Sequence, residues 1–234
     1  MSEDATSKVN VSGLDAIRAA RVEWRLEQIL GAATRLMATT TFDRMLVSDI
    51  AREADVSVGT IYQYVSAKED ILLLIVSQII EAYRGEVPAA MEKVEDPVER
   101  LAAGFRAYCH VVDNHRAAAL LAYQESKSLT REGRERLMSL ELETNSYFSD
   151  CIEEGMELGK FVRVDPGLVA SDLSLLAHMW ALKHWHLKTQ FSFEAYVNHQ
   201  LCFMVKALVV NQLQSSYLGL FKGDCTSQGE RSSA

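Results

Sequence analysis

The sequence predicts an all-α fold, and three observations support this prediction. Apolar residues recur at three- and four-residue spacing along most of the chain, which is typical of amphipathic helices. Helix-start signals occur at residues 66–69 (S-A-K-E), 96–97 (D-P) and 165–166 (D-P), where a capping side chain precedes glutamate or proline. No segment shows the strict alternation of apolar and polar residues that a half-buried strand requires.

The chain is expected to form two helical domains, because 234 residues are long for one domain. A small module is predicted over residues 15–68 and a larger domain over residues 69–222. A polar, disordered arm (1–14) and a flexible tail (223–234) are expected to flank them. The hydrophobic content of 48% is ample for a core in each domain.

The small module is predicted to contain three helices. Asp15 is expected to cap the first, which runs to about residue 39 and buries a stripe that includes Ile29 and Ala33. A short second helix follows, in which Ile50 and Ala54 share one face. The first helix therefore supports the two short helices that come after it.

A tight turn at residues 55–56 is predicted to join the second and third helices. Asp55 tolerates the left-handed backbone that such a turn demands. Ser57 can cap the third helix, whose core-facing residues are Ile61 and Val65 at i, i+4 spacing. The capping box at residues 66–69 then begins a long apolar helix.

Two short helices joined by such a turn have the geometry of a DNA-binding helix-turn-helix. In that motif the start of the second helix meets base edges, while nearby hydroxyls, amides and cations hold phosphates. Thr60, Tyr62 and Gln63 are expected to contact bases or phosphates, and Lys68 to hold a phosphate. The complete set of expected DNA-binding residues is Arg44, Ser57, Val58, Gly59, Thr60, Tyr62, Gln63, Tyr64 and Lys68.

The residues of this motif carry a family resemblance. The run D-I-A-R-E-A-D-V-S-V-G-T-I-Y-Q-Y-V-S-A-K-E-D-I-L (residues 49–72) resembles the helix-turn-helix signature of the TetR family of transcriptional regulators, and the likeness covers roughly residues 25–72. Three positions depart from the family pattern. Asp55 replaces the usual turn glycine, Val65 replaces phenylalanine, and residues 45–46 (M-L) stand where a Thr or Ser usually caps a helix and touches a phosphate.

The resemblance implies a function and an architecture. Members of the family are repressors that bind palindromic operators as homodimers, with a small-molecule pocket between the middle helices and a dimer interface formed by the last two. G-T-I-Y-Q-Y followed by K-E-D-I-L is also similar to the members that respond to fatty acyl-CoA. Those residues lie in the DNA-binding module, so they say little about the effector.

The charge distribution is unusual for a DNA-binding chain, because the net charge is −8. Residues 1–68 hold 8 Lys and Arg against 9 Asp and Glu, whereas residues 69–234 hold 16 against 23. The acidic excess therefore lies beyond the motif. Weak non-specific DNA binding is expected, with affinity depending on local basic residues such as Arg18, Arg21, Arg25 and Arg44.

The larger domain is predicted to contain helices near residues 69–84, 97–112, 115–129, 131–158, 168–188 and 192–213, with a break at Pro88 and a stop at Gly159. The last two helices are apolar on all sides, which favours burial against a second subunit. Packing in a monomer core is the alternative. The expected dimer-interface residues are Leu176, Met179, Trp185, Phe203 and Leu208.

A pocket for a small apolar effector is expected among the middle helices, because amphipathic groups there interrupt apolar surfaces. Each of these groups alone is also typical of a satisfied core residue. The candidates are Tyr108, Tyr123, Glu125, Tyr147, Trp180 and His184. Fatty acyl-CoA is one candidate effector class, and an effector-independent DNA-binding dimer is the alternative function.

Catalysis, metal binding and cofactors are not predicted. Cys109 and His110 are adjacent and point to different sides of a helix, which does not suit a nucleophile and its base. His178, His184 and His186 lack the i, i+4 spacing of a helical metal pair, and no Gly-rich phosphate loop occurs. The first 14 residues contain no apolar run, so we expect no signal peptide and a cytoplasmic protein.

Overall fold

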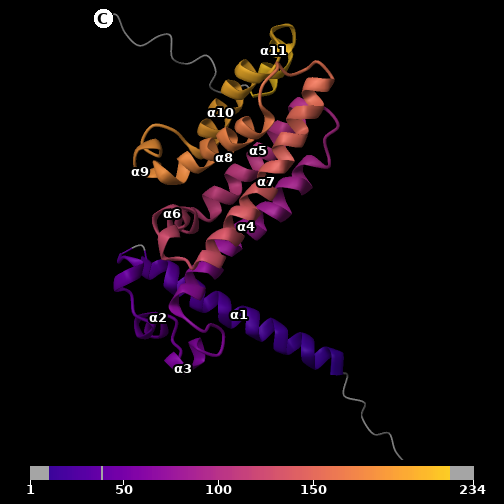
Figure 1. Ribbon diagram of the computed structural model, residues 1–234. Helices are drawn as coiled ribbons and strands as arrows, with labels where there is room; N and C mark the ends of the chain where they lie inside the picture. The colour runs from indigo at the N-terminus through magenta and orange to yellow at the C-terminus, as the bar shows by residue number, and fades with distance from the viewer. Residues whose placement is uncertain (1–10, 38, 222–234) are drawn as a thin grey trace, which may run out of the picture. The chain divides into compact units, whose positions relative to one another are not determined.

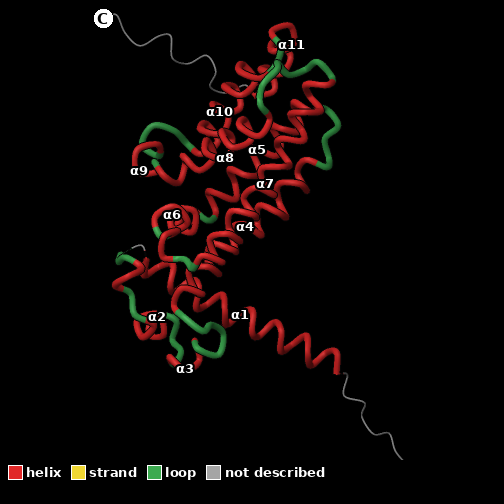
Figure 2. Tube along the Cα trace, in the orientation of Figure 1, coloured by secondary structure: helices red, strands yellow, loops and turns green. Residues whose placement is uncertain are grey.

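The computed structural model describes residues 11–37 and 39–221, and these are almost entirely helical (Figures 1 and 2). No β-strand forms in these ranges, where the only β-type pairing is a single antiparallel bridge between Phe161 and Val209. This confirms the all-α prediction. Within the described ranges, no helix is long and apolar enough to cross a membrane.

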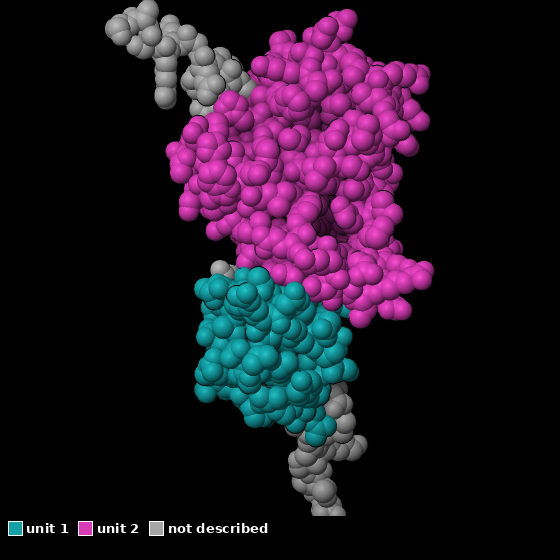
Figure 3. All heavy atoms as spheres, turned by 60° about the vertical axis from the view of Figure 1, so that its left-hand side comes forward, with its two compact units in different colours: residues 1–74 teal, residues 75–234 magenta. Residues whose placement is uncertain are grey.

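The chain divides into two compact units, residues 1–74 and 75–234 (Figure 3). Unit 1 contains α1 (Val11–Met37), the 3-10 helix η1 (Phe42–Arg44), α2 (Val47–Glu53), α3 (Val58–Ile61) and the beginning of α4 (Lys68–Met91). Helix α1 begins before Asp15, which lies inside it, so residues 11–14 belong to the helix and not to an arm. The rest of the expected arm and the expected tail lie outside the described residues.

The core of unit 1 contains the predicted apolar positions. Ile29, Ala33 and Ile50 are fully buried, and Ile61 and Val65 join them from the far side of the turn. The start of α4 differs in detail from the predicted capping box. Asp70, one residue beyond Glu69, accepts hydrogen bonds from the backbone amides of residues 66 and 67, at 2.8 and 2.9 Å.

Unit 2 is a helical bundle built from the remainder of α4 and the helices that follow it. These are α5 (Pro97–Asn114), α6 (Arg116–Gln124), η2 (Ser126–Ser128), α7 (Arg131–Glu157), α8 (Pro166–Leu182), α9 (His184–Leu187), α10 (Phe193–Leu208), α11 (Asn211–Leu218) and η3 (Gly219–Phe221). Helices α5, α7 and α8 pack against one another at its centre. Three helix starts are capped as predicted, because Asp96, Asp165 and Ser192 accept hydrogen bonds from amides in the first turns of α5, α8 and α10.

Two helix ends in unit 2 depend on special backbone residues. Gly159 adopts a left-handed φ of +68° just beyond α7 and ends that helix as predicted. The predicted break at Pro88 is wrong, since α4 continues through Pro88 to Met91. A proline removes its own N–H bond and crowds the carbonyl four residues before it. The carbonyl of Pro88 still accepts from the amide of Glu92 at 2.9 Å, so the last turn survives.

Two predicted helices are each divided in the structure. The helix expected over residues 168–188 ends at Leu182 and resumes as α9 after Lys183. The helix expected over residues 192–213 ends at Leu208, where the chain becomes extended. There the amide of Val162 donates to the carbonyl of Leu208 at 2.8 Å, and the amide of Val210 donates to that of Lys160 at 3.0 Å. Pairing with the segment after α7 therefore replaces the helical bonds of the Leu208 carbonyl and the Val210 amide.

Candidate nucleic-acid interface and ligand pocket

The turn between α2 and α3 has the predicted left-handed residue. Asp55 has a φ of +53° and, within the described ranges, no other non-glycine residue has a positive φ. The backbone amide of Val56 donates a hydrogen bond to the carbonyl of Ala51 at 2.9 Å and closes the turn. Aspartate is one of the few side chains that adopts this conformation at low cost, so replacing the usual glycine preserves the angle between the two helices.

Ser57 caps α3 through its hydroxyl group. Its Oγ accepts from the amide of Thr60 at 3.0 Å and lies 2.8 Å from the Thr60 hydroxyl. Regular α-helix extends only to Ile61, and tighter turns carry the chain through Gln63 to Val65. The capped first turn of α3 therefore presents its outer side chains on a fixed backbone.

None of the side chains expected to contact DNA is fully buried in the core of unit 1. Tyr62 is 52% exposed, and Val58 and Gln63 are also exposed, whereas the inner residue Ile61 is completely buried. Of the remaining expected contacts, Ser57, Gly59 and Arg44 are exposed, and Thr60, Tyr64 and Lys68 are half-buried. Seven of the nine residues lie between Ser57 and Tyr64, in α3 and next to it, while Arg44 lies in η1 and Lys68 begins α4.

The cations of unit 1 differ in how far they are already paired. Arg35 and Arg52 form ion pairs with Glu53 and Asp49, both at 2.8 Å. Arg44 is exposed and has no ion-pair or hydrogen-bond partner among the residues the structure describes. Arg44 is thus available to a phosphate.

Lys68 has its ammonium group directed at the protein backbone. Its Nζ lies 2.9 Å from the carbonyl oxygen of Phe42, 3.3 Å from that of Met45 and 3.5 Å from that of Asp43. It also lies 4.4 Å from the centroid of the Phe42 ring. An ammonium group has three hydrogens, so these contacts can occupy all of them. Lys68 therefore ties the start of α4 to the loop that precedes α2.

The first helix of the motif lacks the hydroxyl cap that is usual in the family pattern. Leu46 occupies the N-cap position of α2 and makes no side-chain capping bond. Instead, the carboxylate of Asp49 accepts from the amide of Leu46 at 3.2 Å. The helix start is stabilised, but residue 46 offers no hydroxyl to a phosphate.

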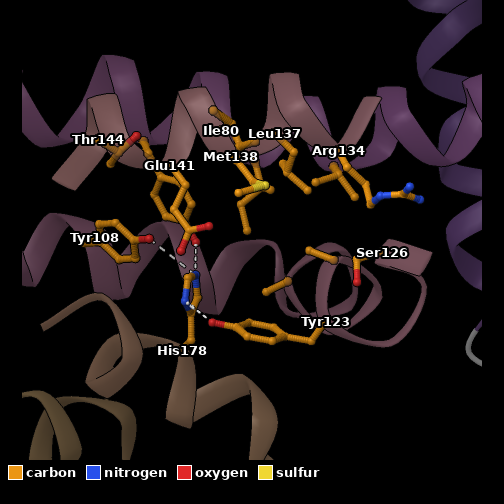
Figure 4. A pocket seen from close by; sticks show the side chains of 15 residues that line it. Ile80, Tyr108, Tyr123, Ser126, Arg134, Leu137, Met138, Glu141, Thr144 and His178 are labelled. Atoms are coloured by element: carbon orange, nitrogen blue, oxygen red, sulfur yellow. Dashed lines mark hydrogen bonds between the residues drawn. The ribbon is translucent and has the colours of Figure 1, made fainter. Parts of the chain in front are cut away.

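Unit 2 contains a cavity of about 350 Å³ between α4, α5, α6, α7 and α8, a size within the range of small-molecule sites. One wall is apolar, and the polar side chains gather at the two ends (Figure 4). His178, Tyr108 and Tyr123 lie at one end, and Arg134 and Ser126 lie at the other. The apolar lining consists of Val76, Ile79, Ile80, Ala119, Ala122, Leu137 and Met138.

The polar end of the cavity is a group of three tyrosines around His178. The hydroxyl of Tyr83 lies 2.9 Å and that of Tyr108 3.4 Å from Nε2 of the imidazole, while the hydroxyl of Tyr123 lies 2.9 Å from Nδ1 (Figure 4). The rings of Tyr83 and Tyr108 stack with their centroids 4.0 Å apart. Each of the four residues comes from a different helix, so packing of α4, α5, α6 and α8 assembles the group.

Burial keeps this group uncharged. It lowers the pKa of His178 to about 4, so the imidazole is neutral at physiological pH. Burial also raises the pKa of Tyr83, Tyr108 and Tyr123 above the ordinary value, and Glu141 further raises that of Tyr123. All three phenols keep their hydrogens. The imidazole and the three phenols are therefore neutral and rich in hydrogen-bond donors, and the carboxylate of Glu141 lies at the same end of the cavity (Figure 4).

The expected effector residues are distributed over several sites. Tyr108 and Tyr123 line the cavity, whereas Tyr147 lines a separate cavity of about 280 Å³ beside Arg100. Trp180 is buried and donates from Nε1 to Asp113 at 2.7 Å, and its ring packs against that of His184. Glu125 accepts from Ser128 at the end of α6.

Sequence reasoning did not select several residues of the cavity. Tyr83 and His178 have no local motif, and their contact joins positions 95 residues apart in the chain. Glu141 and Arg134 are exposed residues of α7, and their sequence context does not distinguish them from ordinary surface charges. Only the packing of the helices brings these groups together, so no spacing signal could have revealed them.

The last helices leave large apolar side chains on the surface. Trp185 is 70% and Phe203 60% exposed, and Leu175 is also exposed. Of the other expected interface residues, Leu176 and Met179 are half-buried, and Leu208 is buried within its own unit. Monomeric proteins seldom leave several large apolar side chains exposed close together, and these lie on α8, α9 and α10.

Comparison with known proteins adds two family profiles and several relatives. The profile described as "Bacterial regulatory proteins, tetR family" matches residues 29–75, and that described as "Tetracyclin repressor-like, C-terminal domain" matches residues 94–188. The HTH-type transcriptional regulator HbdR of Aromatoleum sp. (strain CIB) is 39% identical over 186 residues, which are 79% of this chain and 81% of the relative.

Two further similarities are more distant. The fatty acid metabolism regulator protein of Bacillus subtilis (strain 168) is 30% identical over 115 residues, which are 49% of this chain and 55% of the relative. The crystal structure of AibR in complex with isovaleryl coenzyme A and operator DNA has a TM-score of 0.67 and 19% identity, over 76% of this chain and 97% of AibR. At that identity the likeness to AibR shows a shared fold.

Proposed function

The chain belongs to the TetR family of bacterial regulatory proteins and is a DNA-binding transcriptional regulator, and on this premise we propose that it is an effector-controlled repressor. In this proposal a homodimer binds a palindromic operator through the two copies of α3. A small apolar effector in the cavity of unit 2 then changes the affinity for the operator. The observation that carries the proposal is the presence of an exposed recognition helix and a mostly apolar cavity in one chain.

The recognition surface supports the DNA-binding part of the proposal. Tyr62 and Gln63 are exposed beside a capped helix start and are proposed to contact bases, with Thr60 beside them. Arg44 is proposed to contact a phosphate. Lys68 is proposed to act on DNA binding mainly by fixing the loop before α2, since its ammonium group contacts three backbone carbonyls.

The exposed apolar side chains of α8, α9 and α10 support the homodimer. Trp185 and Phe203 are large, apolar and more than half exposed, and burial of each such side chain contributes roughly 1.5–3 kcal/mol. A second copy of the chain is the proposed partner, because one recognition helix covers few base pairs and a two-fold dimer reads two half-sites about one DNA turn apart.

The size and lining of the cavity support an apolar effector. A fatty acyl-CoA is the proposed class, since seven apolar side chains form the wall. Relatives point the same way, because one is named a fatty acid metabolism regulator and AibR was crystallised with isovaleryl coenzyme A. In the proposed mechanism the effector favours a dimer whose recognition helices no longer match the operator spacing.

The DNA-binding claim is tested by selecting operators from random DNA with the purified full-length protein and footprinting the selected sites. Two symmetric half-sites are expected. Arg44→Gln should lower the salt dependence of dimer binding by about two units, one for each subunit. Arg136→Gln, which removes the same charge from an exposed position of α7, should leave it unchanged. Failure to select any DNA sequence would overturn the proposal.

The effector claim is tested with acyl-CoAs of graded chain length. A thermal-shift screen identifies binders, and operator titrations with each binder measure the change in DNA affinity. A compound that stabilises the protein and weakens operator binding is the expected result. A protein that binds its palindrome with the same affinity in the presence of every compound would instead be an effector-independent DNA-binding dimer.

A further inference from the structure

The tyrosine group around His178 limits the chemistry of a ligand in the cavity. A neutral imidazole has one N–H donor and one lone pair. Three phenolic O–H groups surround it, at 2.9 Å (Tyr83), 3.4 Å (Tyr108) and 2.9 Å (Tyr123) from its nitrogens. The imidazole can accept a hydrogen bond from only one of them. At least two of the three phenolic hydrogens are therefore not bound to His178.

Burial decides which phenols donate within the group. Tyr83 and Tyr108 are almost completely buried, whereas Tyr123 is 43% exposed and lines the cavity. A buried hydroxyl without an acceptor costs about 1–3 kcal/mol. Tyr83 and Tyr108 also hydrogen-bond to each other, so the favoured arrangement has one of these two phenols donating to Nε2 and the other donating to its neighbour's oxygen. Nδ1 then carries the imidazole hydrogen and donates it to the oxygen of Tyr123. The O–H of Tyr123 is left pointing away from His178 and towards the cavity.

The charges around the cavity favour a neutral ligand group over an anionic one at the His178 end. Glu141 lines the cavity at the His178 end (Figure 4). Its carboxylate also raises the pKa of Tyr108 and Tyr123, so it repels a second carboxylate there. His178 is neutral there. The cation of the cavity, Arg134, lies at the opposite end (Figure 4) and donates to the backbone carbonyl of Leu129 at 2.5 Å.

We infer that the effector presents a neutral carbonyl oxygen to Tyr123, as a thioester, ester, amide or ketone does, and not a free carboxylate. This inference rests on the proposed effector function of the same cavity. The Tyr123 O–H donates to the carbonyl, the Nδ1–H of His178 donates to the Tyr123 oxygen and orients it, and the apolar wall accepts the hydrocarbon part. Tyr123 is a ligand contact, and His178 is a positioning residue.

The test compares three probes with the same six-carbon chain, each titrated calorimetrically into the full-length protein. Hexanoyl-CoA carries the carbonyl, the thioether hexyl-CoA lacks only that carbonyl, and hexanoate carries a carboxylate. Hexanoyl-CoA is expected to bind about three- to tenfold more tightly than hexyl-CoA, the range for one neutral hydrogen bond. Hexanoate should bind more weakly still.

Variants then assign the preference to one side chain. Tyr123→Phe should make hexanoyl-CoA and hexyl-CoA bind equally, while Tyr147→Phe, on a tyrosine of the second cavity, should keep the wild-type ratio. The inference is overturned if wild-type protein binds hexanoate as tightly as the thioester, or if Tyr123→Phe preserves the ratio. The probe comparison on wild-type protein decides the matter even if Tyr123→Phe does not fold.

The outcomes also separate this inference from the proposed function. If the two CoA compounds bind equally and both change operator affinity, the effector function stands and the carbonyl inference fails. If hexanoate binds tightly and Arg134→Gln abolishes its binding, the ligand is an anion held at the other end. If none of the three probes binds, the proposed acyl effector and the inference both fail.

Discussion

Replacing Lys68 by Met tests whether this lysine acts on the protein or on DNA. Methionine keeps most of the apolar stem and removes the ammonium group that contacts the carbonyl oxygens of Phe42, Met45 and Asp43. We expect the variant to loosen the segment before α2 and leave the rest of unit 1 folded. The carbonyls it exposes are those of η1 and of the residue that follows it.

The magnitude follows from the contact geometry. Hydrogen bonds from a charged donor contribute about 1.5–3 kcal/mol each, but Lys68 is half-buried and water can replace part of each bond. Two contacts, at 2.9 and 3.3 Å, are within normal range, so we estimate a loss of about 2 kcal/mol in local stability. At equilibrium this corresponds to about 30-fold faster amide exchange in α2.

Hydrogen exchange of the full-length protein, followed by mass spectrometry, measures the effect. Lys206→Met, at an exposed position of α10, is the matched control and should change nothing in unit 1. The salt dependence of operator binding, measured where the variant is folded, should equal that of wild type. Unchanged exchange in α2 together with a salt slope lower by about two units, one for each subunit of the dimer, would refute this reasoning and make Lys68 a phosphate contact.

Three further predictions concern unit 2. A Cβ added at Gly155 would lie 2.1 Å from the Phe161 ring, so Gly155→Ala should lower the free energy of unfolding, measured with denaturant, by about 2–3 kcal/mol. The control Gly85→Ala, whose added Cβ meets no atom within 4 Å, should raise it by up to about 1 kcal/mol. Equal effects of the two substitutions would contradict this prediction. The pKa of His178 is lowered to about 4 in the folded protein, so as the pH falls the imidazole is protonated in the unfolded chain before it is protonated in the folded one. The free energy of unfolding should therefore fall by about 3 kcal/mol as the pH drops from 6.5 to 4. That part of the pH dependence should vanish in His178→Gln, and an unchanged profile would count against a buried neutral imidazole. Phe203→Lys should shift the mass measured by light scattering from dimer to monomer. A wild-type protein that is already monomeric would contradict the proposed dimer interface on α10.

Local chemistry determined which parts of the fold were predictable. Asp55, Ser57 and Asp96 act on backbone groups within three to five residues, so a short stretch of sequence contains the whole signal. The turn, the start of α3 and the start of α5 were predicted correctly for that reason. The interruption at residues 209–210 depends on hydrogen bonds to residues 160 and 162, which no local pattern in the last helices reveals.

The same distinction applies to the cavity. Tyr108 and Tyr123 stood out because each is an amphipathic residue on an apolar helix, and both line the cavity. Trp180 showed the same signal, yet its indole N–H is satisfied by Asp113 inside the core. A tyrosine or tryptophan on a helix therefore predicts a polar partner, but only the tertiary arrangement shows whether that partner is protein or ligand.

The group around His178 also bears on how relatives of this protein diverge. Four helices supply its members, and the imidazole is the only one of the four side chains that contacts all the others. Changing His178 alone would strand the buried hydroxyl of Tyr83, whereas losing Tyr123 alone would leave a vacancy that solvent can fill. In relatives that acquire a new effector, substitution is therefore expected to begin at Tyr123. His178 and the stacked pair of Tyr83 and Tyr108 should be replaced later and together. Sequences reconstructed along such a lineage should show that order of replacement.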